Sequence, residues 1–264
     1  MTDQERIKES LRKFYDRNVR YHELIGKCES AGLTYDDLLR DIIEMAKAPG
    51  GDVRLLDVAV GTGHYIDRAR AYGATAFGVD ISIHACRTAK TRNGSLSVCR
   101  SDAECLPYRS GSFDVVLCLQ LLEHTPYPEN VIAEITRVLK QGGILFLSAP
   151  NLLGSNLLTR TYRAARAMFS RDVKRLVPLR EDILARWDAA GSVQEVSDGD
   201  ACNRTNIFQA FRLLKRNSLE VRRFDTLRHP GKYRPRELAL ARTMQKIPFL
   251  RFTGINFKII ASKP

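Results

Sequence analysis

Residues 53–67 read VRLLDVAVGTGHYID, and this stretch decides the fold of the chain. A short apolar run suited to a buried parallel strand is followed by Gly61 and Gly63, and then by residues that can form a helix. Glycines suit such a turn because the chain must adopt unusual φ values and because a Cβ would keep a ligand away from the backbone. The stretch therefore predicts a strand, a tight loop and a helix whose free N–H groups face a ligand.

The residues around this loop separate two classes of ligand. Loops that bind dinucleotides follow the pattern G-x-G-x-x-G, in which the third glycine allows close packing around a pyrophosphate. Ile66 occupies that third position here. Asp57, at the end of the strand, would repel a pyrophosphate but would attract an ammonium group. The loop therefore favours a ligand that carries an amine and a carboxylate over one that carries phosphates.

Residues 57–63, DVAVGTG, resemble the first motif of the class I S-adenosylmethionine-dependent methyltransferases, D/E-x-G-x-G-x-G. Ala59 replaces the first glycine of that motif, which is a mild departure. The resemblance implies S-adenosylmethionine as cofactor, with its methionine part held by Asp57, Ala59, Gly61 and Gly63.

Two further acidic residues follow the next two predicted strands. Asp80 ends an apolar run that begins at residue 74, and an acid about 20 residues past the glycine loop suits the two ribose hydroxyls. Ile81, directly behind it, is expected to cover one face of the adenine. The resemblance places Asp102 and Ala103 at the adenine edge. Taken alone, Asp102 also fits a turn or a helix cap, but the carboxyl ends of parallel strands line one crevice, which favours a ligand role.

The fourth predicted strand, residues 113–118, is followed by Leu119 and by Leu-Glu-His at 122–124, which resembles the F-D-x-V strand and L-E-H of the same family. Leu119 is expected beside the cofactor. His124 is the candidate general base, because imidazole titrates near neutral pH; the alternative is a structural histidine in a loop. An N/D-P-P-Y/F motif, typical of amide and exocyclic-amine methylation, does not occur after this strand. Oxygen or carbon acceptors are therefore favoured.

The spacing of apolar residues along the rest of the chain predicts an α/β fold. We expect a Rossmann-like, seven-stranded, mostly parallel sheet whose last strand is antiparallel. One methyltransferase domain is expected over residues 1–264. It comprises a helical preface (1–50), a cofactor-binding core (51–150), a lid or substrate insertion (151–206), and a closing helix and strands with a basic insertion (207–264). The preface resembles the leader of quinone-pathway methyltransferases, which implies that Tyr21 touches the cofactor; the alternative is an aromatic residue packed on the core.

The net charge of +12 lies largely after Asn151. A basic amphipathic stretch at residues 159–171 and a second basic segment at 228–251 are interpreted as a lid, a seat for an anionic acceptor or a peripheral contact with an anionic membrane. A helix packed on the domain with solvated arginines is the alternative for the first stretch. The sequence leaves the oligomeric state open.

Several classes of protein are excluded by what the sequence lacks. Six scattered cysteines form no C-x-x-C pair and no histidine cluster has zinc spacing, so neither a metal site nor a disulfide framework is expected. The charged first 20 residues and the absence of a run of about 20 apolar residues predict no secretory signal and no membrane span. The expected location is cytoplasmic, or peripheral to a membrane surface.

The function predicted from these features is S-adenosylmethionine-dependent methyl transfer to a small-molecule or lipid-linked acceptor. O-methylation is favoured, and C-methylation stays open. One alternative is a tRNA methyltransferase of the wobble-uridine kind, although no appended RNA-binding module is present, so nucleic acid is not the favoured partner. A second alternative is a non-catalytic protein that binds S-adenosylmethionine.

Overall fold

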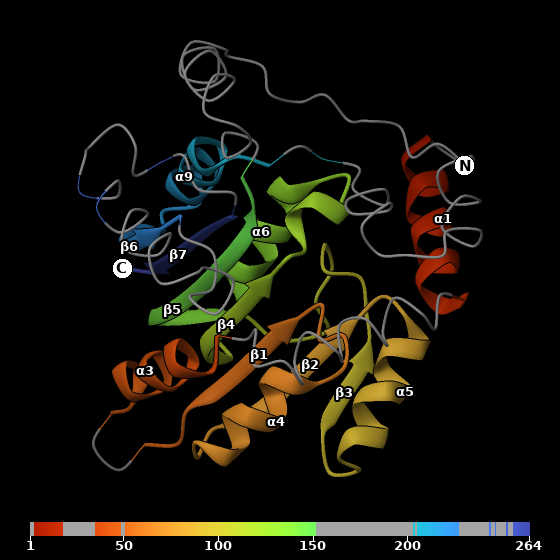
Figure 1. Ribbon diagram of the computed structural model, residues 1–264, viewed down its shortest axis with the longest axis horizontal. Helices are drawn as coiled ribbons and strands as arrows, with labels where there is room; N and C mark the ends of the chain where they lie inside the picture. The colour runs from red at the N-terminus through yellow and green to blue at the C-terminus, as the bar shows by residue number, and fades with distance from the viewer. Residues whose placement is uncertain are drawn as a thin grey trace.

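The computed structural model describes residues 3–17, 35–48, 51–151, 203, 205–226, 243, 246, 252 and 256–264. Strands and helices alternate along most of this length (Figure 1). The helices are α1 (Asp3–Arg17), α3 (Asp36–Ala46), α4 (His64–Ala71), α5 (Ile83–Arg92), the 3₁₀ turn η1 (Leu122–His124), α6 (Pro128–Val138) and α9 (Ile207–Arg216). The strands are β1 (Arg54–Val58), β2 (Thr75–Asp80), β3 (Ser97–Arg100), β4 (Phe113–Leu119), β5 (Leu139–Pro150), β6 (Glu220–Asp225) and β7 (Asn256–Ser262).

The seven strands form one sheet in the order β3-β2-β1-β4-β5-β7-β6. The first five in this order pair in parallel, and β7 runs antiparallel to both β5 and β6. The predicted fold class, including the antiparallel last strand, is confirmed. The strand order reverses direction between β1 and β4, and crevices for ligands form beside such a point at the carboxyl ends of the strands.

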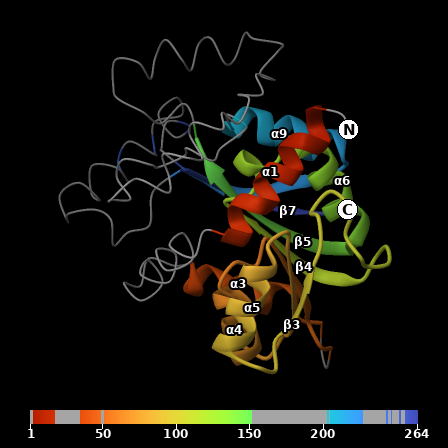
Figure 2. The same ribbon diagram turned by 90° about the vertical axis from the view of Figure 1, so that its right-hand side faces the viewer.

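Successive side chains of the central strands point to opposite faces of the sheet, which divides the core into two layers. Leu55 and Phe146 face the helices α3 and α4, whereas Leu56 and Leu145 face α6 and α9. Figure 2 shows α3, α4 and α5 on one side of the sheet and α6 and α9 on the other. Because central strands of a parallel sheet are covered on both faces, their apolar runs are nearly continuous, as the sequence reads.

The boundary between α6 and β5 is abrupt. Helix α6 ends at Val138, and β5 begins at the next residue, Leu139. Phe113 pairs with Leu139 and Val115 with Ile144, so β5 bulges between these pairs. Gly142 has φ +74° in this bulge, and the Lys140 ammonium binds the Asp114 carboxylate at 2.8 Å. The bulge allows the chain to turn from α6 directly into the sheet.

Helices α1 (residues 3–17) and α3 (residues 36–46) lie within the expected preface. Most of the predicted insertion at 151–206, the basic stretch at 159–171 and nearly all of the basic segment at 228–251 lie outside the described residues. Among the residues that are described, no helix combines the length and the apolar character needed to cross a membrane.

Candidate functional site

The glycine loop connects β1 to α4 through a series of left-handed residues. Ala59, Gly61 and Gly63 have φ values of +70°, +53° and +79°. The N–H groups of Ala59 and Val60 both donate to the Val79 carbonyl oxygen at 2.9 Å, which ties the loop to β2. A Cβ on Gly63 would lie 2.8 Å from the Ala89 Cβ of α5. Gly63 is thus required for close packing of the loop against α5, in addition to its backbone conformation.

Asp80, at the carboxyl end of β2, is oriented by two backbone amides. Its Oδ2 accepts a hydrogen bond from the Gly61 N–H at 3.0 Å, and its Oδ1 accepts one from the Ser82 N–H at 2.9 Å. Burial raises the pKa of this carboxyl, while hydrogen bonds from the backbone of Ser82, Gly61 and Ile81 oppose that shift. Each carboxylate oxygen can accept a second hydrogen bond, so the group remains competent to bind ligand hydroxyls.

Asp57 is 2% exposed in the middle of the sheet, with Gly78 of β2 on one side and Leu117 of β4 on the other. The nearby Tyr65 hydroxyl accepts a hydrogen bond from the Tyr35 N–H at 3.3 Å. Burial raises the pKa of Tyr65, and the Asp57 charge adds to that rise, so the phenol stays neutral beside the carboxylate. Asp57 therefore provides a buried negative charge at the foot of the glycine loop.

Asp102 follows β3 and takes part in two kinds of contact. Its Oδ1 accepts from the Glu104 N–H at 2.9 Å, which is the turn that the sequence left open as an alternative. Its Oδ2 lies 2.9 Å from the Lys8 ammonium of α1, which also pairs with Glu104 at 2.9 Å. Ala103 packs against the core layer of α6 and α9.

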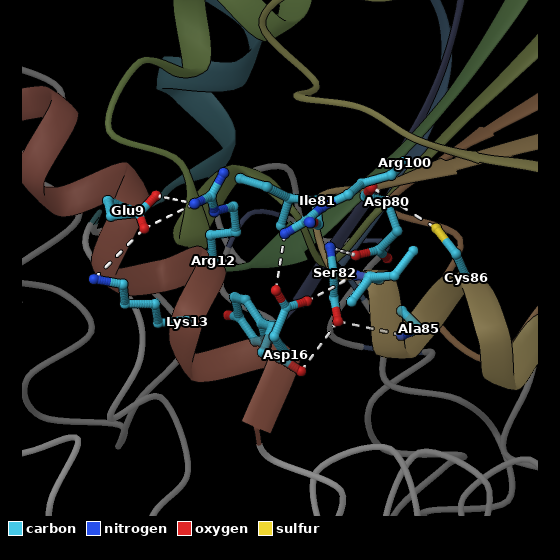
Figure 3. A network of polar contacts seen from close by, with 12 residues as sticks. Glu9, Arg12, Lys13, Asp16, Asp80, Ile81, Ser82, Ala85, Cys86 and Arg100 are labelled. Atoms are coloured by element: carbon cyan, nitrogen blue, oxygen red, sulfur yellow. Dashed lines mark hydrogen bonds and ion pairs between the residues drawn. The ribbon is translucent and has the colours of Figure 1, made fainter.

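Helix α1 is anchored directly over the loop between β2 and α5, a contact that the sequence analysis missed (Figure 3). Asp16 accepts hydrogen bonds from the Ile83 N–H at 2.7 Å and from Arg100 Nη2 at 2.8 Å. The Ser82 hydroxyl donates to the Tyr15 carbonyl at 3.1 Å, and Arg100 Nε donates to the Ile81 carbonyl at 2.9 Å. The residues that α1 contacts here lie 67 to 84 residues away from it in sequence, so no local pattern signals these contacts.

The end of β4 brings the last predicted site residues to the same edge of the sheet. Leu119 pairs with Ser148 of β5 and is partly buried against the core layer of α3 and α4. His124, at the end of η1, is 13% exposed, and its Nε2 lies 3.7 Å from the Glu123 Oε1. Its ring meets the Tyr15 ring of α1 edge to face, with centroids 6.1 Å apart. Helix α1 therefore contacts the segments that follow β2, β3 and β4 at this edge of the sheet.

Residues 56–147 match the family model described as a methyltransferase domain. This part of the chain is a methyltransferase domain. The curated relatives include ubiquinone biosynthesis O-methyltransferases of Thiobacillus denitrificans, 34% identical over 40% of this chain and 47% of the relative, and of Methylococcus capsulatus, 38% identical over 37% and 44%. The matched region thus covers a little under half the length of each of these relatives.

Solved structures share the fold of this methyltransferase domain at low sequence identity. A structure from Thermotoga maritima, titled a SAM-dependent methyltransferase and possible histamine N-methyltransferase, has a TM-score of 0.57 at 18% identity and covers 96% of this chain and 100% of its own. The [4+2]-cyclase SpnF has a TM-score of 0.52 at 22% identity, covering 87% of this chain and 80% of its own. Since one of these titles names a cyclase, the fold by itself does not decide the reaction.

S-adenosylmethionine is the cofactor of this domain class, and the residues present fit it. The loop offers the Gly61 backbone close to Asp80, and carboxylates at the ends of β1, β2 and β3 suit an ammonium group, two hydroxyls and an amine. The same three negative charges would oppose a pyrophosphate.

Some predicted residues are not placed. Tyr21 lies outside the described residues, as do Cys28 and Cys202. The four described cysteines, Cys86, Cys99, Cys105 and Cys118, are free thiols. Within the described ranges, no three His, Cys, Asp or Glu side chains come together as metal ligands.

Proposed function

We propose that this protein transfers a methyl group from S-adenosylmethionine to a hydroxyl of a small molecule. The observation that carries the proposal is the Asp80 carboxylate, held by the Gly61 and Ser82 amides at the mouth of a glycine loop within a methyltransferase domain. The names of the relatives support an oxygen acceptor of the quinone-pathway kind. Residues 1–264 are proposed to act as one domain, with 151–206 as the acceptor-covering insertion.

Each predicted residue has a role in this proposal. Asp57, Ala59, Gly61 and Gly63 would hold the methionine part of the cofactor, with the Asp57 charge toward its ammonium group. Asp80 would accept the ribose hydroxyls, and Ile81 would cover the adenine. Asp102 and Ala103 would meet the adenine edge, and Leu119 would line the crevice. Tyr21 is proposed as a further cofactor contact from the preface.

When bound, the cofactor would supply a methyl group on a sulfonium, and the sulfur would keep the electron pair of the carbon–sulfur bond when the acceptor oxygen takes the methyl group. The protein must align the acceptor and exclude water, so proximity is the large contribution. His124 is proposed to take the hydroxyl proton, with Glu123 beside it at 3.7 Å to stabilise the imidazolium. Helix α1 would help to exclude water, because it closes over the loops after β2 and β3.

We further propose that the methyl acceptor is linked to a lipid. The basic segments at 159–171 and 228–251 would then contact an anionic membrane surface. Methyl transfer to a carbon atom, to a wobble uridine in tRNA, and cofactor binding without turnover remain the alternatives to be tested.

Calorimetric titration with S-adenosylmethionine and, separately, with NAD tests the cofactor. Wild type is expected to bind S-adenosylmethionine at micromolar concentration and NAD far more weakly, and Asp80→Ala should lose the binding. Asp37→Ala is the matched control, because its carboxylate is 97% exposed on α3. A preference for NAD, or equal loss in both variants, would contradict the proposal.

Methyl transfer to 3,4-dihydroxybenzoate, to an alkylated catechol in vesicles and to unmodified tRNA tests the acceptor. Transfer to either catechol, lost or strongly reduced in His124→Ala with cofactor affinity retained, is the expected outcome. Transfer to tRNA alone would support the RNA alternative, and binding without any transfer would support the non-catalytic one.

A further inference from the structure

Three described residues other than glycine have a positive φ: Ala59 at +70°, Gln120 at +53° and Ser218 at +57°. Ser218 has an ordinary structural explanation, since it ends α9 and lets the Leu219 N–H cap the Leu214 carbonyl at 2.9 Å. Ala59 belongs to the cofactor loop. Gln120 ends no helix and belongs to no glycine motif, so its conformation requires another reason.

Gln120 lies opposite the cofactor loop. Strands β1 and β4 are parallel neighbours, with Val58 paired to Cys118. Ala59 directly follows β1 and Gln120 directly follows β4, at the edge of the sheet where Asp57 and Asp80 lie close to the carboxyl ends of β1 and β2. The two strained residues therefore lie at the same edge of the sheet, the edge at which ligands bind in such folds.

The left-handed conformation changes the direction in which the Gln120 side chain points. Val116 and Cys118 of β4 face α6 and α9, and regular alternation would send residue 120 to the same side. Ser148 belongs to the opposite face, in step with Ile144 and Phe146. Gln120 nevertheless donates from Nε2 to the Ser148 Oγ at 3.1 Å, so the strained backbone turns the carboxamide across the sheet edge.

Several contacts fix the carboxamide there. The Gln120 N–H donates to the Ser148 carbonyl oxygen at 2.7 Å, and the fully buried Ser148 side chain is hydrogen-bonded to Tyr35. Tyr35 is itself held, because its hydroxyl also bonds to Asn256 and its ring lies 5.7 Å from the Phe146 ring. Because Nε2 is engaged with Ser148, the carbonyl oxygen Oε1 is the end of the amide that can accept a hydrogen bond from a ligand.

We propose that Gln120 orients the methyl acceptor, its Oε1 accepting a hydrogen bond from an uncharged hydroxyl of the substrate. This inference rests on the proposed function and deepens it, since an amide oxygen selects a protonated hydroxyl and not a phenolate. The attacking oxygen is then held at the end of β4, between the cofactor loop and η1, until its proton leaves.

Two substitutions separate the side chain from the backbone. Gln120→Ala removes the carboxamide and keeps a residue with a Cβ in the left-handed conformation. It should lower kcat/KM for 3,4-dihydroxybenzoate about five- to tenfold, the effect of one lost hydrogen bond, with unchanged affinity for S-adenosylmethionine. Gln120→Gly should lower kcat/KM to the same extent while raising Tm by about 2 °C, because it relieves the left-handed strain.

Matched variants make the test specific. Ser218→Gly relieves the same kind of strain at an exposed helix end, so it should raise Tm and leave the kinetics unchanged. Gln120→Glu keeps an oxygen that can accept a hydrogen bond from the substrate hydroxyl, and its other oxygen can receive one from the Ser148 hydroxyl. The KM of this variant for 3,4-dihydroxybenzoate should therefore lie close to the wild-type value.

The outcomes are distinct. A wild type that turns over the catechol while Gln120→Ala keeps full kcat/KM would overturn this inference and leave the proposed function intact. A wild type that binds S-adenosylmethionine but methylates neither catechol would overturn the hydroxyl acceptor and this inference with it. A loss of cofactor affinity in Gln120→Ala would show that the residue serves the cofactor and would also overturn the inference.

Discussion

Ala59 stands where the family motif has a glycine, and its φ of +70° shows why glycine is usual there. A Cβ in the left-handed region costs roughly 1–2 kcal/mol, and alanine has the smallest side chain that carries one. The loop nevertheless keeps its form, because the N–H groups of Ala59 and Val60 are tied to the Val79 carbonyl. The sequence departure is therefore absorbed as local strain and leaves the hydrogen bonds of the loop intact.

Ala59→Gly should stabilise the protein by about 1 kcal/mol, the relieved strain less the entropy that glycine adds to the unfolded chain. Urea denaturation measures the change. Ala71→Gly is the control, since glycine in the exposed last turn of α4 should cost about 0.5–1 kcal/mol. Equal destabilisation in both variants would show that residue 59 carries no strain.

The strand, loop and helix around residues 54–71 act as a packed unit. The sequence assigned both glycines of the loop to backbone freedom and ligand approach. In the structure they differ: a Cβ on Gly61 would meet no atom within 4 Å, whereas one on Gly63 would lie 2.8 Å from Ala89 and 3.1 Å from Leu96. Gly63 therefore serves the contact between the loop and α5.

Gly63→Ala should cost about 2–4 kcal/mol, because it combines left-handed strain with a clash against the α5 backbone. Gly61→Ala carries the strain alone and should cost about 1 kcal/mol. Thermal unfolding of the two variants without cofactor measures the difference. Similar unfolding temperatures would mean that α5 moves away at little cost.

Over the whole molecule, the charge of +12 is the property that most favours the RNA alternative. Its bearing on function can be measured directly, because binding through phosphates has a characteristic dependence on salt. Contacts to six to ten phosphates lose roughly 10³ to 10⁵ in affinity between about 50 and 200 mM salt.

We expect kcat/KM for a small catechol to change by less than about threefold over that range, since screening acts mainly on exposed charges. Initial rates at four salt concentrations measure this. Titration of the same protein with tRNA provides the comparison. Tight tRNA binding that vanishes as salt rises, together with absent catechol turnover, would reverse the assignment.

The sequence by itself determined the order of strands and helices, the glycine loop, and the acidic residues at the ends of β1 and β2 and after β3. These features are local, because the spacing of apolar residues, the turn residues and the spacing within a motif can each be recognised in a stretch of about 20 residues. The resemblance added the cofactor class, and the match over residues 56–147 agrees with it.

Only the tertiary structure decided how α1 closes over the loop after β2, and why Gln120 turns toward Ser148. Lys8 meets Asp102 across 94 residues, and Asp16 meets Arg100 across 84. Such pairs produce no recognisable pattern in the sequence, because they depend on where the sheet brings distant segments together. The direction of the Gln120 side chain likewise depends on its left-handed φ value, and a glutamine in the sequence does not predict such a value.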